Sequence, residues 1–475
     1  MCVVLALQSG GNLLPFQESY AHSRQVDQRL TNSHPVRIIY VGAFIVMPDQ
    51  YENFEEEQDM SDETPQEGVP PQENDGMDGE EGGEFLNPDN IIETIELDEN
   101  DGDSEDAVTN DMGDMELQGY GEGGEEMDLK DDADIVFTKH KGSVFCIATD
   151  PGTSTLAVTG GEDDRAYVFK LATGEVMFEC TGHKDSVTCA CFCYDSKYVA
   201  TGDMSGIIKV WDVESKQEVW SFETSDLEWL EWHTAAHVLL AGSIDGSMWM
   251  WKIPNGDTKT FQAHGVPTNI GKILPDGKRC CVGYEDGAVK TYDLKTSKLS
   301  HSFTGNSGHA ASITSLDCHS NNNLIITGST DVTAKVISAN NGKVLSTYNC
   351  ASESDEEDNS VEAVGFSKTH SLAATGTLKG TLSIWDINTH QCRLQCKHEN
   401  GIVRLRWDES TPFIYTCTLD GIVHMWDGRN GQRMAQWYGH QGEILDFDIT
   451  RDGNTLVTAS DDGTARVFTL HSPDR

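Results

Sequence analysis

The sequence predicts an all-β fold, a β-propeller of eight four-stranded blades preceded by an acidic, disordered N-terminal region. Three observations predict it. A mostly aromatic position that ends a short β-rich run recurs every 40 to 48 residues. A turn residue stands six positions before it, and it is aspartate in six of eight units. A histidine opens six of the units. Because a sheet this small cannot bury its own faces, repeated units are expected to pack side by side into a ring.

One unit, residues 398–427, shows the pattern most fully. Three runs rich in β-forming residues follow one another at residues 401–407, 413–418 and 422–426. Between the last two runs stands Asp420-Gly421, a pair that tolerates the positive φ of a tight hairpin. Each unit is therefore expected to supply consecutive antiparallel strands of one blade.

The same positions can be followed through all eight units. The closing positions are Phe169, Trp211, Trp251, Tyr292, Ile337, Trp385, Trp426 and Phe468. The turn positions are Asp163, Ser205, Asp245, Asp286, Asp331, Lys379, Asp420 and Asp462. The opening histidines are His140, His183, His264, His309, His398 and His440. Residues 134–137 are expected to form the strand that closes the ring against the last unit, which leaves no long open sheet edge.

A period of 40 to 45 residues with Gly-His at the opening and Trp-Asp at the close resembles the WD40-repeat family, over residues 135–470. The resemblance implies that the turn aspartate accepts a hydrogen bond from the opening histidine, which is tied to the tryptophan side. This would be a structural network, since each buried unpaired polar group costs about 1 to 3 kcal/mol. The residues expected in it are His140, Asp163, His264, Asp286, His309, Asp331, His398, Asp420, Trp426, His440 and Asp462.

Only the unit of His398, Asp420 and Trp426 has all three residue types at the expected positions. The second unit has Ser205 where the aspartate is expected. The third unit lacks the opening Gly-His, and the sixth lacks both the histidine and the aspartate. We therefore expect the third and sixth blades to open more readily than the others.

Charge divides the chain into three parts. Residues 1–50 form an N-terminal extension that is expected to be disordered and to which the family resemblance does not extend. Residues 51–133 form an acidic region, and residues 134–472 the propeller. Residues 51–135 hold 33 Asp and Glu against one basic residue, Lys130. Such a composition cannot bury enough apolar surface to offset its ordering entropy, so the region is predicted to be disordered.

The net charge of −46 bears on the choice of partner. Binding DNA, RNA or anionic lipid requires Lys and Arg to displace counterions, so direct nucleic-acid binding is not expected. The same field attracts basic proteins and raises their encounter rate. The alternative is that the acidity only keeps the chain soluble. No apolar run is long enough to cross a membrane, and we expect a monomer that binds proteins with basic segments.

Neither a metal centre nor an active site stands out. Thirteen Cys residues lack the spacing of a disulfide scaffold, which favours a reducing compartment. The tightest group, Cys189, Cys191 and Cys193 near His183, is a candidate zinc site, although three thiols on one strand give poor tetrahedral geometry and small buried side chains are the alternative. Because phosphate loops, nucleophile elbows and HExxH motifs are absent from the sequence, we expect neither catalysis nor a cofactor.

The candidate binding surface is the mouth of the ring on which the opening histidines and turn aspartates lie. An acidic ring with aromatic anchors suits a Lys/Arg-rich segment, through charge-assisted hydrogen bonds and cation–π contacts. A solvated rim without a dedicated ligand is the alternative. The acidic side chains expected there are Glu162, Asp185, Asp203, Asp226, Glu228, Glu285, Glu399, Glu443 and Asp461, with Trp229, Trp232 and Tyr284 nearby.

An insertion at residues 352–358 lengthens the spacing between the fifth and sixth units. Ser352 and Ser354 each have an acidic residue at the third following position, a context that favours acidophilic kinases. Both are candidate phosphorylation sites. The alternative is a plain solubilising loop.

Whole segments resemble particular WD-repeat proteins, among them residues 156–164, 182–190, 200–206 and 274–279. This resemblance implies a cytoplasmic protein that also reaches the periphery of the cell membrane and acts in cell migration and angiogenesis. It also implies similarity to propellers that chaperone a basic large-subunit ribosomal protein. The two hypotheses differ in kind, since an adaptor joins several signalling proteins and a chaperone holds one basic client.

Overall fold

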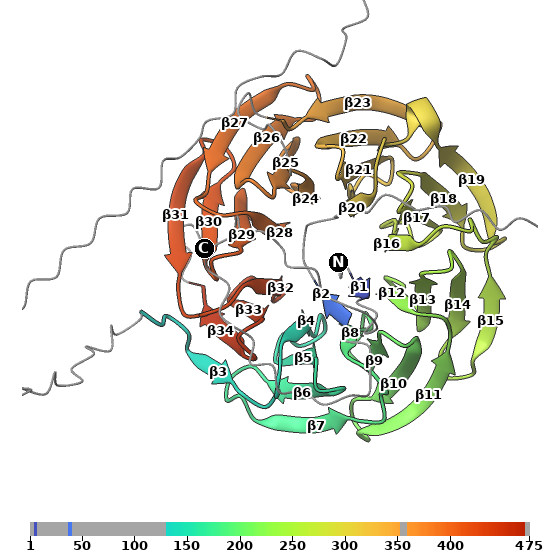
Figure 1. Ribbon diagram of the computed structural model, residues 1–475, viewed down its shortest axis with the longest axis vertical. Coiled ribbons are helices and arrows are strands. Elements are labelled where there is room, and N and C mark those ends of the chain that lie inside the picture. Colours follow the sequence, from blue (N-terminus) through green and yellow to red (C-terminus); the bar gives the residue numbers. More distant parts are fainter. Residues whose placement is uncertain (1–3, 7–36, 40–129, 352–358, 471–475) are drawn as a thin grey trace, which may run out of the picture. The chain divides into compact units, whose positions relative to one another are not determined.

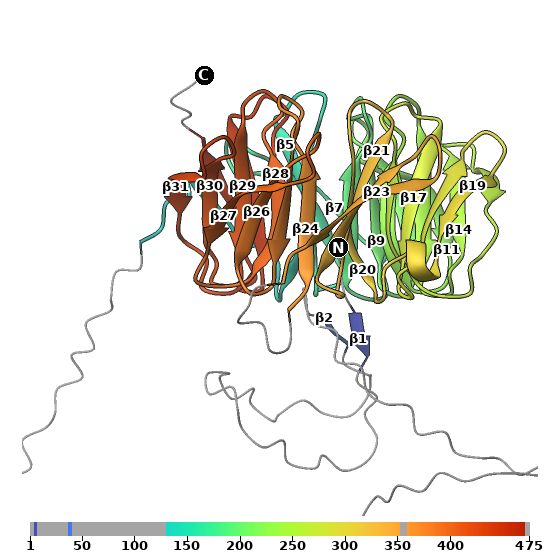
Figure 2. The same cartoon turned by 90° about the horizontal axis from the view of Figure 1, so that it is seen from above.

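The fold is described from a computed structural model. It covers residues 4–6, 37–39, 130–351 and 359–470. Within these residues eight four-stranded antiparallel sheets surround a common centre as the blades of a closed β-propeller, which confirms the predicted fold (Figure 1). Figure 2 shows the same blades from the side, standing next to one another as separate sheets.

Each blade runs from its inner strand outward in chain order. Blade 1 is β4 (Val144–Thr149), β5 (Leu156–Gly161), β6 (Ala166–Lys170) and β7 (Val176–Cys180). Blade 2 is β8 (Val187–Phe192), β9 (Tyr198–Asp203), β10 (Ile207–Asp212) and β11 (Gln217–Glu223). Blade 3 is β12 (Leu227–Trp232), β13 (Val238–Ser243), β14 (Met248–Lys252) and β15 (Asp257–Thr260). Blade 4 is β16 (Thr268–Ile273), β17 (Arg279–Tyr284), β18 (Val289–Asp293) and β19 (Lys298–Phe303).

The second half of the ring repeats the arrangement. Blade 5 is β20 (Ile313–Cys318), β21 (Leu324–Ser329), β22 (Thr333–Ser338) and β23 (Lys343–Asn349). Blade 6 is β24 (Val361–Phe366), β25 (Leu372–Thr377), β26 (Thr381–Asp386) and β27 (Cys392–Lys397). Blade 7 is β28 (Ile402–Trp407), β29 (Phe413–Thr418), β30 (Val423–Asp427) and β31 (Gln432–Trp437). Blade 8 contains β32 (Ile444–Ile449), β33 (Thr455–Ser460) and β34 (Ala465–Thr469).

The outer strand of blade 8 comes from the other end of the propeller sequence. It is β3 (Ile135–Phe137), which pairs antiparallel with β34 and places Ile135 opposite Val467. Asp134 continues the contact, because its carboxylate accepts the backbone N–H of Thr469 at 2.7 Å. The prediction that residues 134–137 close the ring is thereby confirmed.

Tight turns join the second and third strands of the blades, and one position shows why glycine is needed there. Gly421, between β29 and β30, has φ +77°, a left-handed conformation that side chains rarely adopt. A Cβ at this position would also lie 2.8 Å from the carbonyl oxygen of Gly442. The predicted hairpin at Asp420-Gly421 is therefore confirmed.

The core lies between neighbouring blades, because inner strands are largely buried and outer strands are largely exposed. All six residues of β24 are buried, whereas all four residues of β15 are exposed. One apolar cluster joins Phe137 and Val457 of blade 8 to Phe169 of blade 1. Each blade thus buries its faces against its neighbours, the packing expected of a repeat array.

Two kinds of segment gather on one face of the propeller, which we call the rim face. They are the connections from one blade to the next and the turns between the second and third strands. The short 3-10 helix η1 (Gly305–Ser307), in the connection from β19 to β20, lies on this face, which is the lower face in Figure 2 and the one viewed in Figure 1.

Several predictions lie outside the described residues. They include the candidate phosphorylation sites Ser352 and Ser354, nearly all of the acidic region 51–133 and most of residues 1–50. Within the last of these segments, β1 (Val4–Ala6) pairs antiparallel with β2 (Arg37–Ile39). Among the described residues, none forms a helix long and apolar enough to span a membrane.

Candidate protein-binding surface

A chain of hydrogen bonds runs through blade 2 just below the rim face. Asp203 accepts a hydrogen bond from Nδ1 of His183 at 3.1 Å, and Nε2 of the same ring accepts the hydroxyl of Thr201 at 2.8 Å. The Thr201 oxygen in turn accepts the indole N–H of Trp211 at 3.1 Å. Blade 2 therefore holds a complete network of four side chains, all of them buried.

This corrects two expectations about Asp203. The sequence pattern placed the network aspartate at position 205, which is Ser205, and placed Asp203 on the exposed rim. In the structure Asp203 is fully buried. It stands at the end of β9 and reaches back under the turn, where it also accepts Ser205 Oγ and the backbone N–H groups of Lys184 and Ile207. Because its carboxylate holds four donors at once, it is part of the scaffold and does not face a partner.

Blades 1, 5 and 8 carry the histidine and aspartate but lack the tryptophan. His140 lies 2.8 Å from Asp163, and the corresponding pairs are His309 with Asp331 at 3.0 Å and His440 with Asp462 at 2.9 Å. In each blade a threonine contacts the second ring nitrogen, namely Thr159, Thr327 and Thr458. The threonine on the second strand is a recurring member of the network that the sequence analysis missed.

Blade 7 departs from the expected network. His398 was predicted to bond to Asp420, but its Nδ1 lies 3.3 Å from the carbonyl oxygen of Gly380 and its Nε2 accepts the indole N–H of Trp426 at 3.1 Å. Asp420 is exposed and instead accepts Asn400 Nδ2 at 3.0 Å and the Thr418 hydroxyl. The prediction that His398, Asp420 and Trp426 form one complete network is wrong, because Asn400 and Thr418 satisfy the carboxylate first.

The remaining blades have partial networks. In blade 4, Nε2 of His264 lies 2.9 Å from Asp286 and Nδ1 accepts from Lys290. In blade 6, Trp385 donates to Thr375 at 3.0 Å. In blade 3, the indole N–H of Trp251 is buried without a hydrogen-bond partner. The expectation that blades 3 and 6 open more readily stays a prediction.

The pKa shifts fall on different residues in the two kinds of blade: on the aspartates of the aspartate networks and on the histidines of blade 7. Burial opposes ionisation of the network aspartates, but hydrogen bonds from histidine and the backbone outweigh it, so the pKa values of Asp163, Asp203, Asp331 and Asp462 are lowered. In blade 7, burial and the neighbouring His424 lower the pKa of His398 to about 3. Burial also lowers the pKa of His424 to about 4. Both rings are therefore neutral near pH 7.

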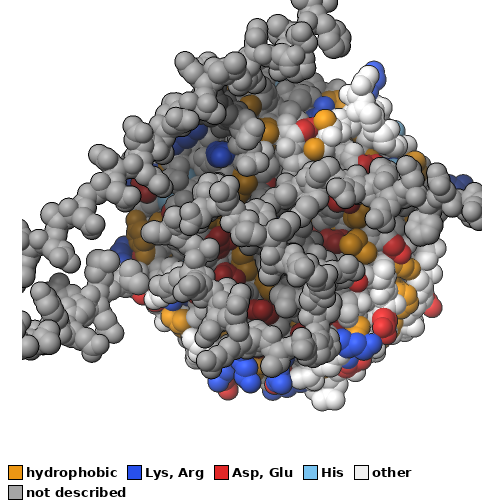
Figure 3. Space-filling model, viewed as in Figure 1, with side chains coloured by type: hydrophobic (Ala, Val, Ile, Leu, Met, Phe, Trp, Pro, Cys, Tyr) orange, Lys and Arg blue, Asp and Glu red, His pale blue; other side chains and the backbone are white. Residues whose placement is uncertain are grey.

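Most of the other predicted acidic residues do lie on the rim face. Glu162, Glu285, Glu399, Glu443 and Asp461 are exposed, and Asp185, Asp226 and Glu228 are half-buried. Figure 3 views this face and shows, in the parts not drawn in grey, Asp and Glu side chains interspersed with apolar ones toward the middle, while Lys and Arg gather at the lower edge, where Figure 1 draws β7.

The rim carboxylates crowd one another at two places. Burial and the nearby Asp185 raise the pKa of Asp164. At the junction of blades 8 and 1, partial desolvation of its carboxylate by surrounding residues and the nearby Asp461 raise the pKa of Glu443, although part of the residue is exposed. Ser143 ties this second group together, since its hydroxyl donates to Asp461 at 2.6 Å and its N–H to Glu162 at 3.1 Å. Carboxylates that repel one another in this way favour a bound cation.

The predicted aromatic anchors are not available on the rim. Trp229 is only 6% exposed, and its indole fills a slot between Gly242 and Gly271, at each of which a Cβ would lie 2.3 Å from the ring. Trp232 donates its N–H to the carbonyl of Cys191, and the Tyr284 hydroxyl lies 2.9 Å from that of Tyr292. The prediction of Trp229 as a binding residue is wrong, because two glycines make room for its indole in the core.

Charged residues on the inner strands were also missed from the sequence. Arg404 on β28 lies 3.4 Å from Asp446 on β32, and Arg406 lies 3.2 Å from Asp448. The two aspartates also accept backbone N–H groups of β4, from Ile147 to Asp446 and from Thr149 to Asp448. These residues link blades 7, 8 and 1 near the ring's centre, which gives them a structural explanation.

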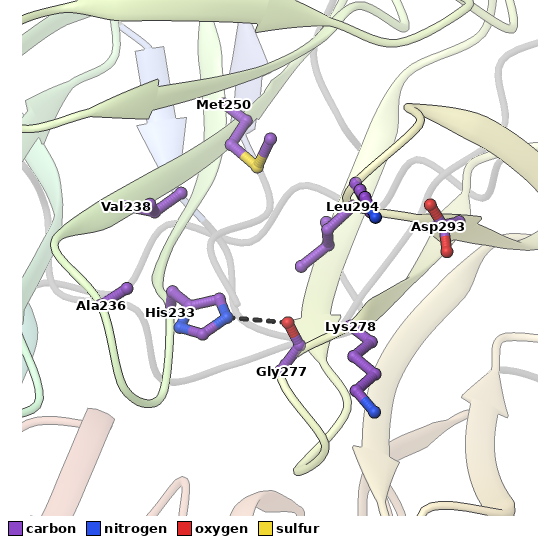
Figure 4. Close-up of a pocket in the computed structure, with 9 residues that line it drawn as sticks. His233, Ala236, Val238, Met250, Gly277, Lys278, Asp293 and Leu294 are labelled. Atoms are coloured by element: carbon purple, nitrogen blue, oxygen red, sulfur yellow. Dashed lines mark hydrogen bonds between the residues drawn. The ribbon is translucent and has the colours of Figure 1, made fainter.

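A pocket of about 390 Å³ lies between blades 3 and 4, on the side of the turns that join first and second strands (Figure 4). His233 projects toward it and donates from Nε2 to the carbonyl oxygen of Gly277 at 2.8 Å. Val238, Met250 and Leu294 supply an apolar wall, and Lys278 and Asp293 stand at its edge. The pocket therefore lies away from the acidic rim.

The cysteines are distributed differently from the candidate zinc group of the sequence. Among the described residues, Cys193 belongs to a possible metal-binding group with Asp195 and His237, and this group does not include Cys189, Cys191 or His183. The thiol of Cys193 donates to Asp195 at 3.0 Å, and Asp195 also contacts His237 of the next blade. Burial raises the pKa of Cys191 and raises that of Cys193 to about 11, so these thiols stay protonated near pH 7.

The blade network and the period of the strands agree with a comparison to protein families. The model for "WD domain, G-beta repeat" matches residues 134–170, 174–212, 297–337, 342–386, 390–427 and 431–469. The chain belongs to the WD-repeat family. Residues 213–296 lie outside these matches, and they contain blade 3, where no opening histidine occurs, and most of blade 4, where Tyr292 replaces the tryptophan.

This WD-repeat protein is similar over most of its length to curated proteins. It is 48% identical over 414 residues to the human protein "Angio-associated migratory cell protein", which covers 82% of this chain and 95% of the relative. It is 47% identical over 416 residues to the dog protein of the same name, with the same coverage. It is also 25% identical over 400 residues to "Ribosome assembly protein SQT1" of Saccharomyces cerevisiae, which covers 72% of this chain and 88% of the relative.

Solved structures show the same fold. Chaetomium thermophilum Sqt1 bound to the N-terminus of the ribosomal protein L10 superposes with a TM-score of 0.66 at 21% identity. The match covers 72% of this chain and 100% of that one. Saccharomyces cerevisiae Sqt1 superposes with a TM-score of 0.67 at 23% identity, again over 72% and 100% of the two chains.

Proposed function

We propose that this WD-repeat protein is a non-enzymatic scaffold whose rim face binds a Lys/Arg-rich segment of a partner protein. The observation that carries the proposal is the set of acidic side chains on that face, two of which, Glu162 and Asp461, are both hydrogen-bonded to Ser143. Bringing like charges together costs free energy, and a basic side chain placed between them recovers it.

The cationic segment would bind mainly through charge. Trp229, Trp232 and Tyr284 are buried, so aromatic anchoring by these residues does not contribute. Arginine suits the junction of blades 8 and 1, where Glu443 and Asp461 lie, because its planar fork forms bidentate hydrogen bonds to carboxylates. Binding is expected to weaken as the salt concentration rises, since exposed charges are screened beyond about 8 Å at physiological ionic strength.

Two kinds of partner are consistent with such a surface. The name shared by the relatives at 47–48% identity favours an adaptor in cell migration and angiogenesis. We propose the cytoplasm and the periphery of the cell membrane as the place where such an adaptor acts. The relation to a ribosome assembly protein favours a chaperone that holds one basic ribosomal protein before large-subunit assembly. The second proposal is supported specifically by the Sqt1 structure, which contains the N-terminus of a ribosomal protein.

The test compares a variant with reversed charges on the rim face with a variant that has reversed charges on the opposite face. The rim variant carries Asp185→Lys, Glu399→Lys and Glu443→Lys. The matched control carries Glu175→Lys, Glu214→Lys and Asp257→Lys, three exposed acids at turns between third and fourth strands, on the face opposite the rim. Both variants change the net charge equally, so a difference between them reports position.

Affinity purification with mass spectrometry is then run on both variants at low and high salt. We expect the rim variant to lose its basic partners at least tenfold and the control to keep them. Loss of a single newly made ribosomal protein supports the chaperone, and loss of several signalling proteins supports the adaptor. Equal partner sets for the rim variant and the unmodified protein would refute binding at the rim.

A further inference from the structure

Three metal-binding side chains converge on the face opposite the rim, at the junction of blades 2 and 3. Cys193 and Asp195 lie in the turn between β8 and β9, and His237 lies in the turn between β12 and β13. Their sulfur, oxygen and nitrogen atoms all lie within 4.8 Å of one another. The sequence separates His237 from Asp195 by 42 positions, so the group exists only because adjacent blades place equivalent turns side by side.

Two of the three separations between the ligand atoms suit a tetrahedral ion after a small expansion, and the third lies within 4.8 Å. Asp195 Oδ1 lies 3.0 Å from Cys193 Sγ and 3.0 Å from His237 Nε2. Zinc bonds of about 2.3 Å to sulfur and 2.0 to 2.2 Å to nitrogen and oxygen place tetrahedral ligands roughly 3.3 to 3.6 Å apart. Each of these two separations would therefore widen by only about half an ångström.

The surroundings already hold the three groups in orientation. The backbone N–H of Tyr198 donates to the sulfur of Cys193 at 3.1 Å, a contact that also stabilises a metal-bound thiolate. The backbone N–H of Lys197 donates to Asp195. The imidazole of His237 stacks on Tyr194 at 5.4 Å and meets the edge of Tyr198 at 4.9 Å. Little side-chain entropy remains to be lost on binding.

Access is also favourable. The side chains of His237 and Asp195 are 26% and 37% exposed, while Cys193 is buried beneath them. An ion can enter from solvent and keep one water as its fourth ligand. The order of the groups does not suit a cysteine nucleophile, because Asp195 stands between the thiol and the imidazole and the histidine cannot take the thiol proton directly.

We propose that Cys193, Asp195 and His237 form a Zn²⁺ site that joins blade 2 to blade 3. A thiolate, an imidazole and a carboxylate match the ligand preference of zinc. On binding, the Cys193 thiol releases its proton to solvent, and the proton on His237 Nε2 is exchanged through solvent for one on Nδ1, which frees the Nε2 lone pair for the metal. One carboxylate oxygen of Asp195 replaces its present hydrogen bonds with a metal bond. The ion thereby tethers blade 3, whose Trp251 indole N–H has no hydrogen-bond partner, to blade 2, whose network is complete.

The test uses the full-length protein, purified with a chelator that is then removed, and Co²⁺ as a spectroscopic probe. We expect one equivalent of Co²⁺ to give a thiolate-to-metal charge-transfer band that one equivalent of Zn²⁺ displaces. Cys193→Ser should abolish the band, and His237→Gln should weaken Co²⁺ binding at least tenfold. The matched control is Cys392→Ser, which removes an exposed thiol in blade 6 and should leave the band unchanged.

Thermal unfolding gives an independent readout. Zn²⁺ should raise the melting temperature of the unmodified protein and of Cys392→Ser, because an ion that binds only the folded state stabilises it. It should not raise that of His237→Gln, which keeps the thiol and can be checked for folding by circular dichroism. Absence of the band in the unmodified protein, or its persistence in a folded His237→Gln variant at unchanged affinity, would overturn the proposal.

Discussion

Blades 2 and 7 contain nearly the same residue types and use them in opposite ways. In blade 2, Asp203 is buried and binds His183, so the histidine connects the aspartate to Thr201 and Trp211. In blade 7, Asp420 is exposed and binds Asn400, and His398 turns to a backbone carbonyl. The comparison teaches that the network depends on which donor reaches the carboxylate and not on a fixed spacing between histidine and aspartate.

The largest expected effect comes from removing the two aspartates in turn. Asp203→Ala leaves His183 and two backbone N–H groups without their acceptor in a buried site, which should cost about 3 to 5 kcal/mol of unfolding free energy. Asp420→Ala removes an exposed acceptor and should cost less than about 1 kcal/mol. Urea unfolding measures both. Similar losses in the two variants would erase the distinction between the blades.

Acid should open blade 7 before blade 2. The folded-state pKa values of His398 and His424 are lowered to about 3 and about 4, so the unfolded chain binds protons below its ordinary histidine pKa of 6.5 while the folded chain does not. Stability is therefore full above pH 6.5 and is lost as the pH falls, by on the order of 1 kcal/mol per pH unit for each ring.

The aspartate of blade 2 responds at lower pH. Because the folded-state pKa of Asp203 is lowered, its contribution is present above the unfolded value near 3.8 and is lost only as the pH falls below it. Hydrogen exchange at pH 5 against pH 7.5, corrected for intrinsic rates, should show β28 to β30 losing protection while β8 to β10 keep theirs. His424→Phe should reduce the pH dependence of blade 7. Simultaneous loss of protection in both blades would contradict the assignment.

The smallest difference between the two blades is expected at the tryptophans, where they should behave alike. Trp211 donates to Thr201 and Trp426 donates to His398, both at 3.1 Å. Replacing either by Phe keeps most of the apolar volume and removes one buried hydrogen bond, at about 1 to 2 kcal/mol each. Equal losses of unfolding free energy in the two variants would mean that the blades differ at their aspartates and not at their tryptophans. A loss at Trp426 several-fold above that at Trp211 would locate it elsewhere.

The fold could be predicted from sequence because it depends on local spacing repeated many times. The turn at Gly421 and the closing strand at residues 134–137 both follow from the period of the repeat. The network of blade 2 could not be predicted by counting six positions back from Trp211, because Asp203 reaches under the turn from the strand end. Its buried threonine is visible in the sequence only once the strands are aligned.

The candidate surfaces were harder to predict, since they depend on contacts between blades. The position of Trp229 within its repeat predicts a place near the rim. Its ring instead lies in the core, because the small size of Gly242 and Gly271 leaves room for it there. Cys193 stands in a conspicuous run of cysteines, yet its partners are Asp195 and His237. A sequence repeat reveals the position of a residue within its own blade, whereas these roles are decided by the neighbouring blade.

The closing strand has a consequence for the synthesis of the protein. Asp134 and Thr469, which meet at the closure, are 335 positions apart in the chain. At 5 to 20 residues per second, the ribosome needs on the order of half a minute to deliver the second partner after the first. During that interval β3 has nothing to pair with, and it directly follows the acidic region. Any factor that holds the acidic region on the nascent chain would also control when the ring can shut.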